Sequence, residues 1–203
     1  KSDDGLIDLV TEGRPKVLAE MAGKPMVQWV LDAIAATDRV NNVVIIGLDT
    51  HHGLNCGDKT VHYIPSAGSI IDNVSSGITK LTTINPDSRI VLWASGDLPL
   101  ITSAMLNWFL DRTEETDCEF YYQIIEQGVM EGRFPGSNRT FTRINGNNVC
   151  GGDVSAFSTS IASGANPAWR KISSARKSII RQAAIVGLWP LVLLVAGQMT
   201  KER

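Results

Sequence analysis

The sequence predicts an α/β domain whose open, mostly parallel sheet carries helices on both faces. Strand-like and helix-like stretches alternate along the first half of the chain, which is the order that builds such a sheet. Hydrophobic residues make up 43% of the 203 residues and charged residues 20%, a composition typical of a globular protein with a full core. Because ligands bind beyond the carboxyl ends of the strands in such sheets, site residues are expected there.

Three helices and three strands are expected in the first half. A helix over residues 25–36 begins at a proline, whose missing N–H costs little in the first turn, and repeats apolar residues at helical spacing. The run VVIIGL at residues 43–48 is apolar and largely β-branched, as in a strand buried on both faces. The remaining expected elements are a strand at 61–65, a helix at 69–83, a strand at 89–95 and a helix at 103–115 that Thr102 caps.

The second half has a different pattern. Strands are expected at residues 119–125, 139–144 and 149–157, separated by turn-rich loops, as an extension of the sheet. From Pro167 onward the pattern is helical. We therefore predict a main domain over residues 1–165 and a C-terminal helical segment, residues 166–203, that packs on or beside it.

The two ends of the sequence lack the usual boundary signals. The first residue is Lys1 rather than Met, and KSDDGLIDLV is neither a signal peptide nor a buried strand, so we expect the chain to begin inside a longer protein.

The apolar run AAIVGLWPLVLLVAG at residues 183–197 is shorter than the roughly 20 residues that span a bilayer, and it contains Pro190. We expect a packed amphipathic helix here, with contact to a membrane or a partner as the alternative.

Charge and cysteine content limit the partners. The formal net charge of −2 gives no general attraction to nucleic acid or to an anionic membrane, so any phosphate site must be local. The three cysteines are widely spaced and form neither a metal motif nor a disulfide framework. This usage is typical of a reduced, cytoplasmic protein.

Asp97 is the best candidate for a catalytic residue. The apolar strand RIVLWAS delivers it at its carboxyl end, Gly96 lets the backbone turn, and Pro99 fixes the following loop. A carboxylate in this place can hold Mg²⁺ against triphosphate oxygens, where the ion would neutralise charge during phosphoryl transfer. The other interpretation is that Asp97 caps a turn or a helix.

Two stretches are candidates for nucleotide binding. In RPKVLAEMAGKPM, residues 14–26, Lys16 can bind phosphate as a point charge, and a solvated basic loop is the alternative. In PSAGSIIDN, residues 65–73, a strand leads through small residues to a helix N-terminus that can receive an anion or the edge of a base. A plain capping turn has the same pattern. The candidates in this turn are Ser66, Gly68, Ser69 and Asn73, the last with a side-chain amide that can read a base.

Acceptor binding is predicted for the second half. Gly151 and Gly152 lie within a strand pattern, which indicates either close approach of a ligand or a β-bulge, and Asp153 follows them. Arg133 and Arg139, together with Arg143, can clamp a phosphorylated acceptor bidentately. The other interpretation of these three arginines is a solvated hairpin.

The histidines and the common nucleotide motifs give no further site. His51 and His52 share a polar loop and His62 begins a strand, but we find no Asp, Glu or Cys with metal-ligand spacing to them and assign them no role. The sequence contains no G-x-x-x-x-G-K-[ST], G-x-G-x-x-G or G-x-S-x-G motif. These absences count against P-loop NTPases, dinucleotide oxidoreductases and α/β-hydrolases.

The order of these pieces resembles one known family. Lys16 with VLAEMAGKPMVQWVL, then VVIIGL, then the turn at residues 68–73, then SGDLPLIT follow one another as in the MobA-like NTP transferase family. The resemblance covers residues 14–157. This family includes the molybdenum-cofactor guanylyl- and cytidylyltransferases and sugar-phosphate nucleotidyltransferases. The resemblance implies a Rossmann-like, three-layer fold of the nucleotide-diphospho-sugar transferase type.

The resemblance also implies a reaction and roles for individual residues. Asp97 would be the metal-binding aspartate, Lys16 would contact the NTP phosphates, and residues 66–73 would lie beside the nucleobase. By looser analogy, residues 151–153 would lie on the acceptor side. The implied reaction is attack by an acceptor phosphate or hydroxyl on the α-phosphorus of an NTP, with release of pyrophosphate. Positioning and charge neutralisation would supply most of the rate gain.

The sequence departs from the family pattern in two places. The family opens with a strand and a loop of the type L-A-G-G-x-G-x-R-M, whose N–H groups cradle the phosphates, and the sequence starts at Lys1 without it. A second metal-binding aspartate is also usual nearer the C-terminus, where Asp153 is the late aspartate that follows Asp117. Two alternatives stay open, a non-catalytic nucleotide-binding or scaffold domain on the same fold and a nucleotide-sugar glycosyltransferase. The lack of a D-x-D motif at Asp97 counts against the second.

Overall fold

The computed structural model describes residues 14–161, and their first short elements lead the chain into helix α2. These elements are the 3₁₀ turn η1 (Lys16–Leu18) and the short strands β1 (Glu20–Met21) and β2 (Lys24–Pro25), which pair antiparallel. A tight turn joins the two strands, and both of its residues, Ala22 and Gly23, have positive φ angles. The hairpin therefore returns the chain to the point where α2 begins.

Helix α2 (Met26–Ala35) confirms the helix predicted from the proline onward. Pro25 is its N-cap residue, where the missing backbone N–H is not needed by the helix. Val27 and Leu31 are buried at helical spacing and belong to a core cluster with Val43 of the following strand.

Strands β3 (Asn42–Ile46) and β4 (Thr60–Ile64) form a parallel pair, with Val43 opposite Val61. Both strands were predicted, and β3 was predicted from its apolar, β-branched sequence. The short 3₁₀ turn η2 (Thr50–His52) lies in the connection between them. Parallel pairing places the carboxyl ends of the two strands at the same edge of the sheet.

The next three elements also agree with the helices and the strand predicted from the sequence. They are helix α3 (Ile70–Ile84), strand β5 (Ile90–Ala94) and helix α4 (Ser103–Glu114). Thr102 caps α4 as predicted, because its hydroxyl oxygen accepts a hydrogen bond from the N–H of Met105.

Antiparallel strands extend the sheet in the second half. Strands β6 (Phe120–Glu126), β7 (Thr142–Ile144) and β8 (Asn147–Ser158) were expected there, and they form a sheet of order β5–β8–β6 with β7 paired to β8. Helix α5 (Gln127–Arg133) occupies residues for which a turn-rich loop was predicted. Two glycines lower the helix propensity of this stretch, and so the helix was missed.

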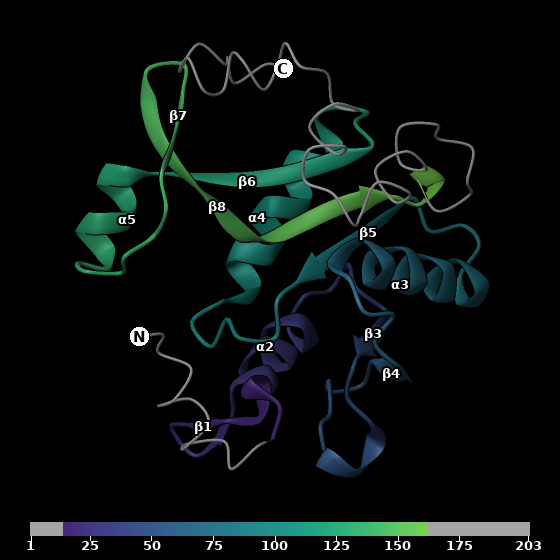
Figure 1. Ribbon diagram of the computed structural model, residues 1–203. Coiled ribbons are helices and arrows are strands. Elements are labelled where there is room, and N and C mark those ends of the chain that lie inside the picture. Colours follow the sequence, from purple (N-terminus) through teal and green to yellow (C-terminus); the bar gives the residue numbers. More distant parts are fainter. Residues whose placement is uncertain (1–13, 162–203) are drawn as a thin grey trace.

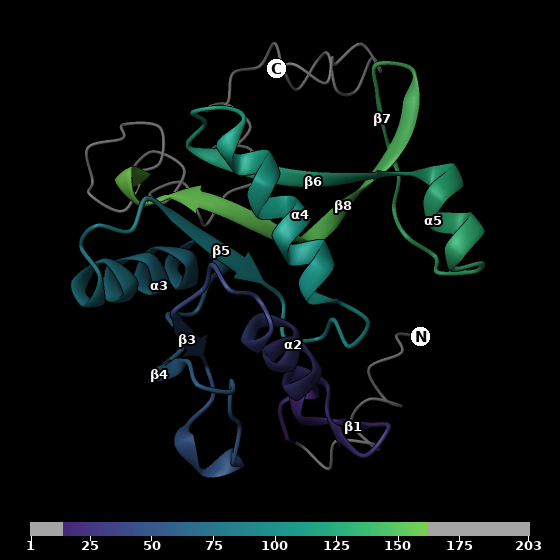
Figure 2. The ribbon, with the colours of Figure 1, turned by 180° about the vertical axis from the view of Figure 1, so that it is seen from behind.

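Helices cover both faces of β5 (Figures 1 and 2). Leu92 packs in a cluster with Ala33 of α2 and Phe109 of α4. Its neighbour Val91 packs in a different cluster with Ile78 of α3. Because successive side chains of a strand point to opposite sides, the sheet lies between α2 and α4 on one face and α3 on the other. The predicted three-layer arrangement is therefore present.

A cavity of about 580 Å³, lined by both apolar and polar residues, lies between β3 and β5, whose facing edges are not paired with each other among the described residues. Val44 of β3 and Leu92 of β5 contribute to its walls, and α2 and α3 close it above and below the sheet. Within residues 14–161, the parallel pair and the larger sheet are therefore joined by packing of helices rather than by a continuous hydrogen-bond ladder.

Further sequence expectations concern the cysteines, the membrane and the C-terminal segment. Cys56 and Cys150 are buried and Cys118 is exposed, and all three thiols are unpaired, as expected. Over residues 14–161, we find no helix with the length and apolar character needed to span a bilayer. The predicted C-terminal segment, residues 166–203, lies outside the described residues together with its apolar run.

Candidate functional site

Lys16 and Asp97 meet beyond the carboxyl end of β5. The Nζ atom of Lys16 donates a hydrogen bond to Oδ2 of Asp97 at 2.7 Å, although the two residues are 81 positions apart in sequence. The Lys16 side chain is 52% exposed and that of Asp97 28%, so a ligand can reach both. The structure thus brings together the residue predicted to bind phosphate and the residue predicted to bind metal.

Asp97 is held in its ionised form. Partial burial by itself would raise the pKa of Asp97, but hydrogen bonds from Lys16 and Ser95 and the positive charge of Lys16 outweigh burial, so that the pKa lies below its ordinary value. Ser95 donates from Oγ to the other carboxylate oxygen, Oδ1, at 2.5 Å. An ionised, partly exposed carboxylate is a hard oxygen donor, and the site therefore fits the ligand preference of Mg²⁺.

Gly96 allows this contact to form. A Cβ atom on Gly96 would lie 3.1 Å from Cγ1 of Val17 and 3.5 Å from Cγ2 of Val27. Gly96 is not among the residues with positive φ, so the absence of a side chain matters for space rather than for the backbone turn that was predicted. The close approach to Val17 brings its neighbour, Lys16, to Asp97.

The turn before α3 is held by its own side chains. Oδ1 of Asn73 accepts a hydrogen bond from a backbone N–H of the turn at 2.7 Å, and Oγ of Ser66 accepts one from the N–H of Gly68 at 3.2 Å. Ser69 caps α3 through the N–H of Asp72 at 3.1 Å. The capping interpretation of these residues is thus present in the structure. Asn73 also lines the cavity between β3 and β5, as do residues 95–96 next to Asp97.

Arg139 contacts two of the residues predicted on the acceptor side. Its Nη2 atom donates to the backbone carbonyl of Gly151 at 2.7 Å and to Oδ2 of Asp153 at 3.1 Å. Burial by itself would lower the pKa of Arg139, but the negative charge of Asp153 outweighs burial, and the net pKa is raised. The guanidinium therefore stays charged. Arg133 has a different environment, at the end of α5 with its guanidinium over the ring of Phe134.

The paired glycines form an irregularity in the ladder between β6 and β8. The pairing register shifts between Tyr122 and Ile124 of β6, as the bulge interpretation predicted. A Cβ atom would lie 2.8 Å from Cβ of Gln123 at Gly152 and 1.9 Å from Oη of Tyr122 at Gly151. Side chains of β6 therefore occupy the space beside both glycines.

Ser95 connects the two parts of the site, and its role was not predicted. Its backbone N–H donates to the carbonyl oxygen of Asp153 at 3.1 Å, while its hydroxyl donates to Asp97. Ser95 therefore contacts both Asp97, the candidate metal ligand, and Asp153, the partner of Arg139. The only signal in the sequence is the hydroxyl two positions before Asp97.

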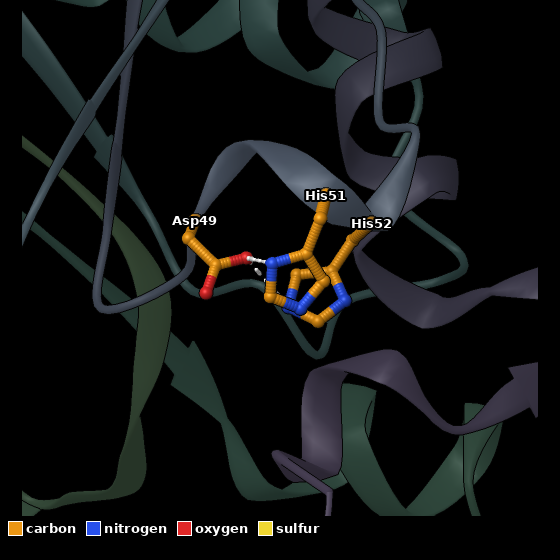
Figure 3. Close-up of side chains that lie close together, drawn as sticks. All are labelled: Asp49, His51 and His52. Carbon is orange, nitrogen blue, oxygen red and sulfur yellow. Dashed lines mark ion pairs between the residues drawn. The ribbon is translucent and has the colours of Figure 1, made fainter.

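A second polar cluster lies in the connection between β3 and β4 (Figure 3). Nδ1 of His51 is 2.5 Å from Oδ1 of Asp49, and Nε2 of His52 is 3.3 Å from the same atom. The expectation that no acidic residue has metal-ligand spacing to these histidines is therefore wrong. The 3₁₀ turn η2 brings residues three positions apart to the same side, which was not recognised in the sequence.

Comparison with known proteins identifies one domain family. The model of the MobA-like NTP transferase domain matches residues 12–181. Bifunctional protein GlmU of Thermoanaerobacter pseudethanolicus is 28% identical over 102 residues, which cover 50% of this chain and 22% of that protein. The protein of the same name from Lawsonia intracellularis is 27% identical over 114 residues, covering 53% and 24%. The chain therefore spans less than a quarter of the length of these relatives.

Solved structures share the fold, and the predicted nucleotide-diphospho-sugar transferase type is confirmed. A hypothetical transferase from Thermus thermophilus has 26% identity and a TM-score of 0.70, with 91% of this chain and 74% of that chain covered. A CMP:2-keto-3-deoxy-manno-octonic acid synthetase complexed with CTP has 15% identity and a TM-score of 0.61, with coverage of 93% and 83%. Since the family match extends over most of the sequence, this chain belongs to the MobA-like NTP transferase domain family, as the order of its motifs predicted.

Proposed function

We propose that this chain is the catalytic domain of a Mg²⁺-dependent nucleotidyltransferase, which transfers a nucleoside monophosphate from an NTP to a phosphorylated or hydroxyl acceptor. The observation that carries the proposal is the contact between Lys16 and Asp97 beyond the end of β5. It combines a cation for phosphate oxygens with a carboxylate for a metal ion. Family membership and the CTP complex of a protein with the same fold support the proposal.

The free protein keeps the two charges neutralised. When an NTP binds, Lys16 would leave Asp97 and donate to phosphate oxygens as a point charge. Asp97 would then hold Mg²⁺, which neutralises negative charge on the phosphates. The hydrogen bond from Ser95 to Oδ1 would keep the carboxylate oriented during this exchange.

The turn before α3 would bind the nucleobase. Ser66, Gly68 and Ser69 present backbone groups beside the first turn of α3, and their own hydrogen bonds fix the loop before any ligand arrives. The carboxamide oxygen of Asn73 is engaged inside this loop, which leaves the amide NH₂ group as the donor to a base.

Acceptor binding would involve Arg139 and Asp153, with Gly151 and Gly152 beside them and Arg133 at the end of α5. Arg139 would exchange Asp153 for a phosphate group of the acceptor, which a guanidinium can bind bidentately. An acceptor oxygen then forms a bond to the α-phosphorus, and the bond from this phosphorus to the bridging oxygen of the departing pyrophosphate breaks. Positioning and electrostatics, rather than a covalent intermediate, supply the rate gain.

Small molecules would be the partners of this reaction, since the net charge of −2 gives no general attraction to nucleic acid. We place the enzyme in the cytoplasm, where unpaired thiols persist. Residues 166–203 would pack on or beside the main domain, residues 1–165.

The proposal is tested with the full-length protein, a panel of the four common NTPs, and phosphorylated sugars as acceptors. We expect one NTP to raise the melting temperature most and to release pyrophosphate only when Mg²⁺ and an acceptor are present. Nucleotide binding without turnover would instead support a non-catalytic nucleotide-binding domain. Glycosyl transfer from a nucleotide sugar would support the glycosyltransferase alternative, and no response to any NTP would remove the proposal.

A further inference from the structure

One turn after β3 carries three metal-ligating side chains that the proposed reaction does not use. Asp49 immediately precedes η2, and His51 and His52 are the last two residues of that turn. In a 3₁₀ turn, residues three positions apart lie almost above one another, so His52 returns to the side of Asp49. Gly53 ends the turn in the left-handed region with a φ angle of 66°.

Two imidazole nitrogens and one carboxylate oxygen converge in this turn (Figure 3). One ligand atom from each of Asp49, His51 and His52 lies within 4.8 Å of the other two. The two imidazole rings lie next to each other, with centroids 4.3 Å apart and planes tilted by 44°. Metal–nitrogen and metal–oxygen bonds of about 2.0–2.2 Å can span such a group with small side-chain adjustments.

We propose that Asp49, His51 and His52 form a binding site for one transition-metal ion of the Zn²⁺ class. Two histidines and one carboxylate are a known donor set for Zn²⁺, and three protein ligands leave an open coordination position. Imidazole nitrogen suits Zn²⁺, Cu²⁺ and Ni²⁺, whereas Mg²⁺ selects oxygen ligands. The ion in this turn is therefore chemically distinct from the Mg²⁺ that Asp97 would hold.

The base of the loop is fixed by hydrogen bonds from the protein body, which reduces the ordering cost of metal binding. Gln28 of α2 makes two hydrogen bonds with the backbone of Asn55, at 2.9 Å and 3.2 Å. The buried thiol of Cys56 lies 3.2 Å from the carbonyl oxygen of Leu31 and donates to it. The segment that follows the turn is therefore held against α2.

Solvent access differs among the three ligands. The side chains of His51 and Asp49 are 73% and 62% exposed, and that of His52 is 21% exposed. An ion can therefore arrive from solvent and meet the two exposed ligands first. His52, the most enclosed of the three, would then complete the site.

The experiment uses the full-length protein after removal of metal with a chelator. A Cys118→Ser background removes the exposed thiol, which is itself a ligand for Zn²⁺. Calorimetric titration with ZnSO₄ should show one equivalent bound. His51→Ala and His52→Ala should each weaken binding by about tenfold or more. His62→Ala is the matched control, because His62 belongs to β4 and not to this turn, and it should bind Zn²⁺ like the parent.

Spectroscopy with a second metal tests the ligand set directly. Electron paramagnetic resonance of one equivalent of Cu²⁺ should show hyperfine coupling to two imidazole nitrogens, and the double variant His51→Ala/His52→Ala should lose it. Unchanged Zn²⁺ affinity in that double variant, or a loss of affinity in His62→Ala, would overturn the proposal. Because no NTP is present, this outcome is independent of whether the chain transfers nucleotides.

Discussion

Lys16 and Asp97 form an ion pair of 2.7 Å that joins η1 to the end of β5. Each group neutralises the other in the free protein, and each is the kind of group that an NTP and its metal ion require. On ligand binding, the contact between Lys16 and Asp97 would be replaced by two contacts, one from Lys16 to phosphate and one from Asp97 to the metal ion. Variants of these two residues should therefore have different effects.

Asp97→Asn is expected to abolish most of the Mg²⁺-dependent release of pyrophosphate. The amide keeps the size of the side chain but loses the negative charge that holds the cation. A bound metal ion supplies several kcal/mol of transition-state stabilisation, and each 1.36 kcal/mol is a factor of ten, so turnover should fall about a hundredfold or more. Asp87→Asn, in the exposed turn after α3, is the control and should keep its activity. Equal turnover in both variants would exclude Asp97 as the metal ligand.

Lys16→Met is expected to raise both the KM for NTP and the pKa of Asp97. Without the lysine, only the remaining hydrogen bonds to the carboxylate oppose the increase in the pKa of Asp97 that burial causes. Lys80→Met, on α3, should leave both quantities unchanged. The carboxyl carbon of Asp97, followed by NMR as a function of pH, measures the shift, and an unchanged titration in Lys16→Met would show that the ion pair does not set this pKa.

The same pair predicts a dependence of stability on pH. The pKa of Asp97 is lower in the folded protein than the reference value of 3.8, so its contribution to stability is fully present above that value. The contribution is lost as the pH falls through the folded-state pKa. Urea unfolding at pH 7 and at pH 3 should therefore show a smaller difference in midpoint for Lys16→Met than for the parent. A difference of equal size would contradict the argument.

Gly96→Ala and Gly128→Ala should change stability in opposite directions. The new Cβ at Gly96 would meet Val17 at 3.1 Å, so we expect a loss of about 1–3 kcal/mol from overpacking. At Gly128, in α5, no atom lies within 4 Å of the new Cβ, and alanine should stabilise the helix by up to about 1 kcal/mol. Urea unfolding of both variants checks the prediction, and a loss at Gly128 as large as that at Gly96 would contradict it.

Most of the fold could be predicted because its elements are specified by local sequence. The apolar run of β3 and the proline at the start of α2 are examples, since each acts through its own backbone and near neighbours. Helix α5 could not be predicted, because its two glycines lower its helix propensity and its packing against β6 and β8 is not visible in the local sequence. That β3 and β5 do not pair with each other within residues 14–161 is likewise a property of strand pairing that no local pattern reveals.

Residues of the site that are marked by local sequence could be predicted, whereas contacts that depend on long-range packing could not. Asp97 was identified from its place at the end of an apolar strand and Lys16 from the basic stretch before a helix, and both are local features of the sequence. The contact between Ser95 and Asp153 depends on the register between β5 and β8, and the contact between Arg139 and Asp153 depends on a loop that returns to β8. The metal-binding turn requires knowledge that Asp49 precedes a 3₁₀ turn rather than an extended loop.

One face of β6 remains uncovered among the described residues. Phe120, Tyr122 and Ile124 are 50%, 54% and 40% exposed, at alternating positions that share one side of the strand. Phe120 stacks on Phe157 of β8 with centroids 4.8 Å apart, and Phe157 belongs to the same core cluster as Ile161, where the described chain ends. The described chain therefore ends close to this apolar stripe.

We expect the apolar run at residues 183–197 to cover the stripe, because both surfaces lose contact with water when they pack together. Ile124→Lys should then accelerate hydrogen–deuterium exchange in residues 183–197 by about tenfold, through loss of the packed state. Val129→Lys, at an equally apolar and 62% exposed position on α5, is the matched control and should leave that exchange unchanged. Equal exchange in the parent and Ile124→Lys would show that the run packs elsewhere, and sedimentation of the parent with lipid vesicles would show that it contacts a membrane instead.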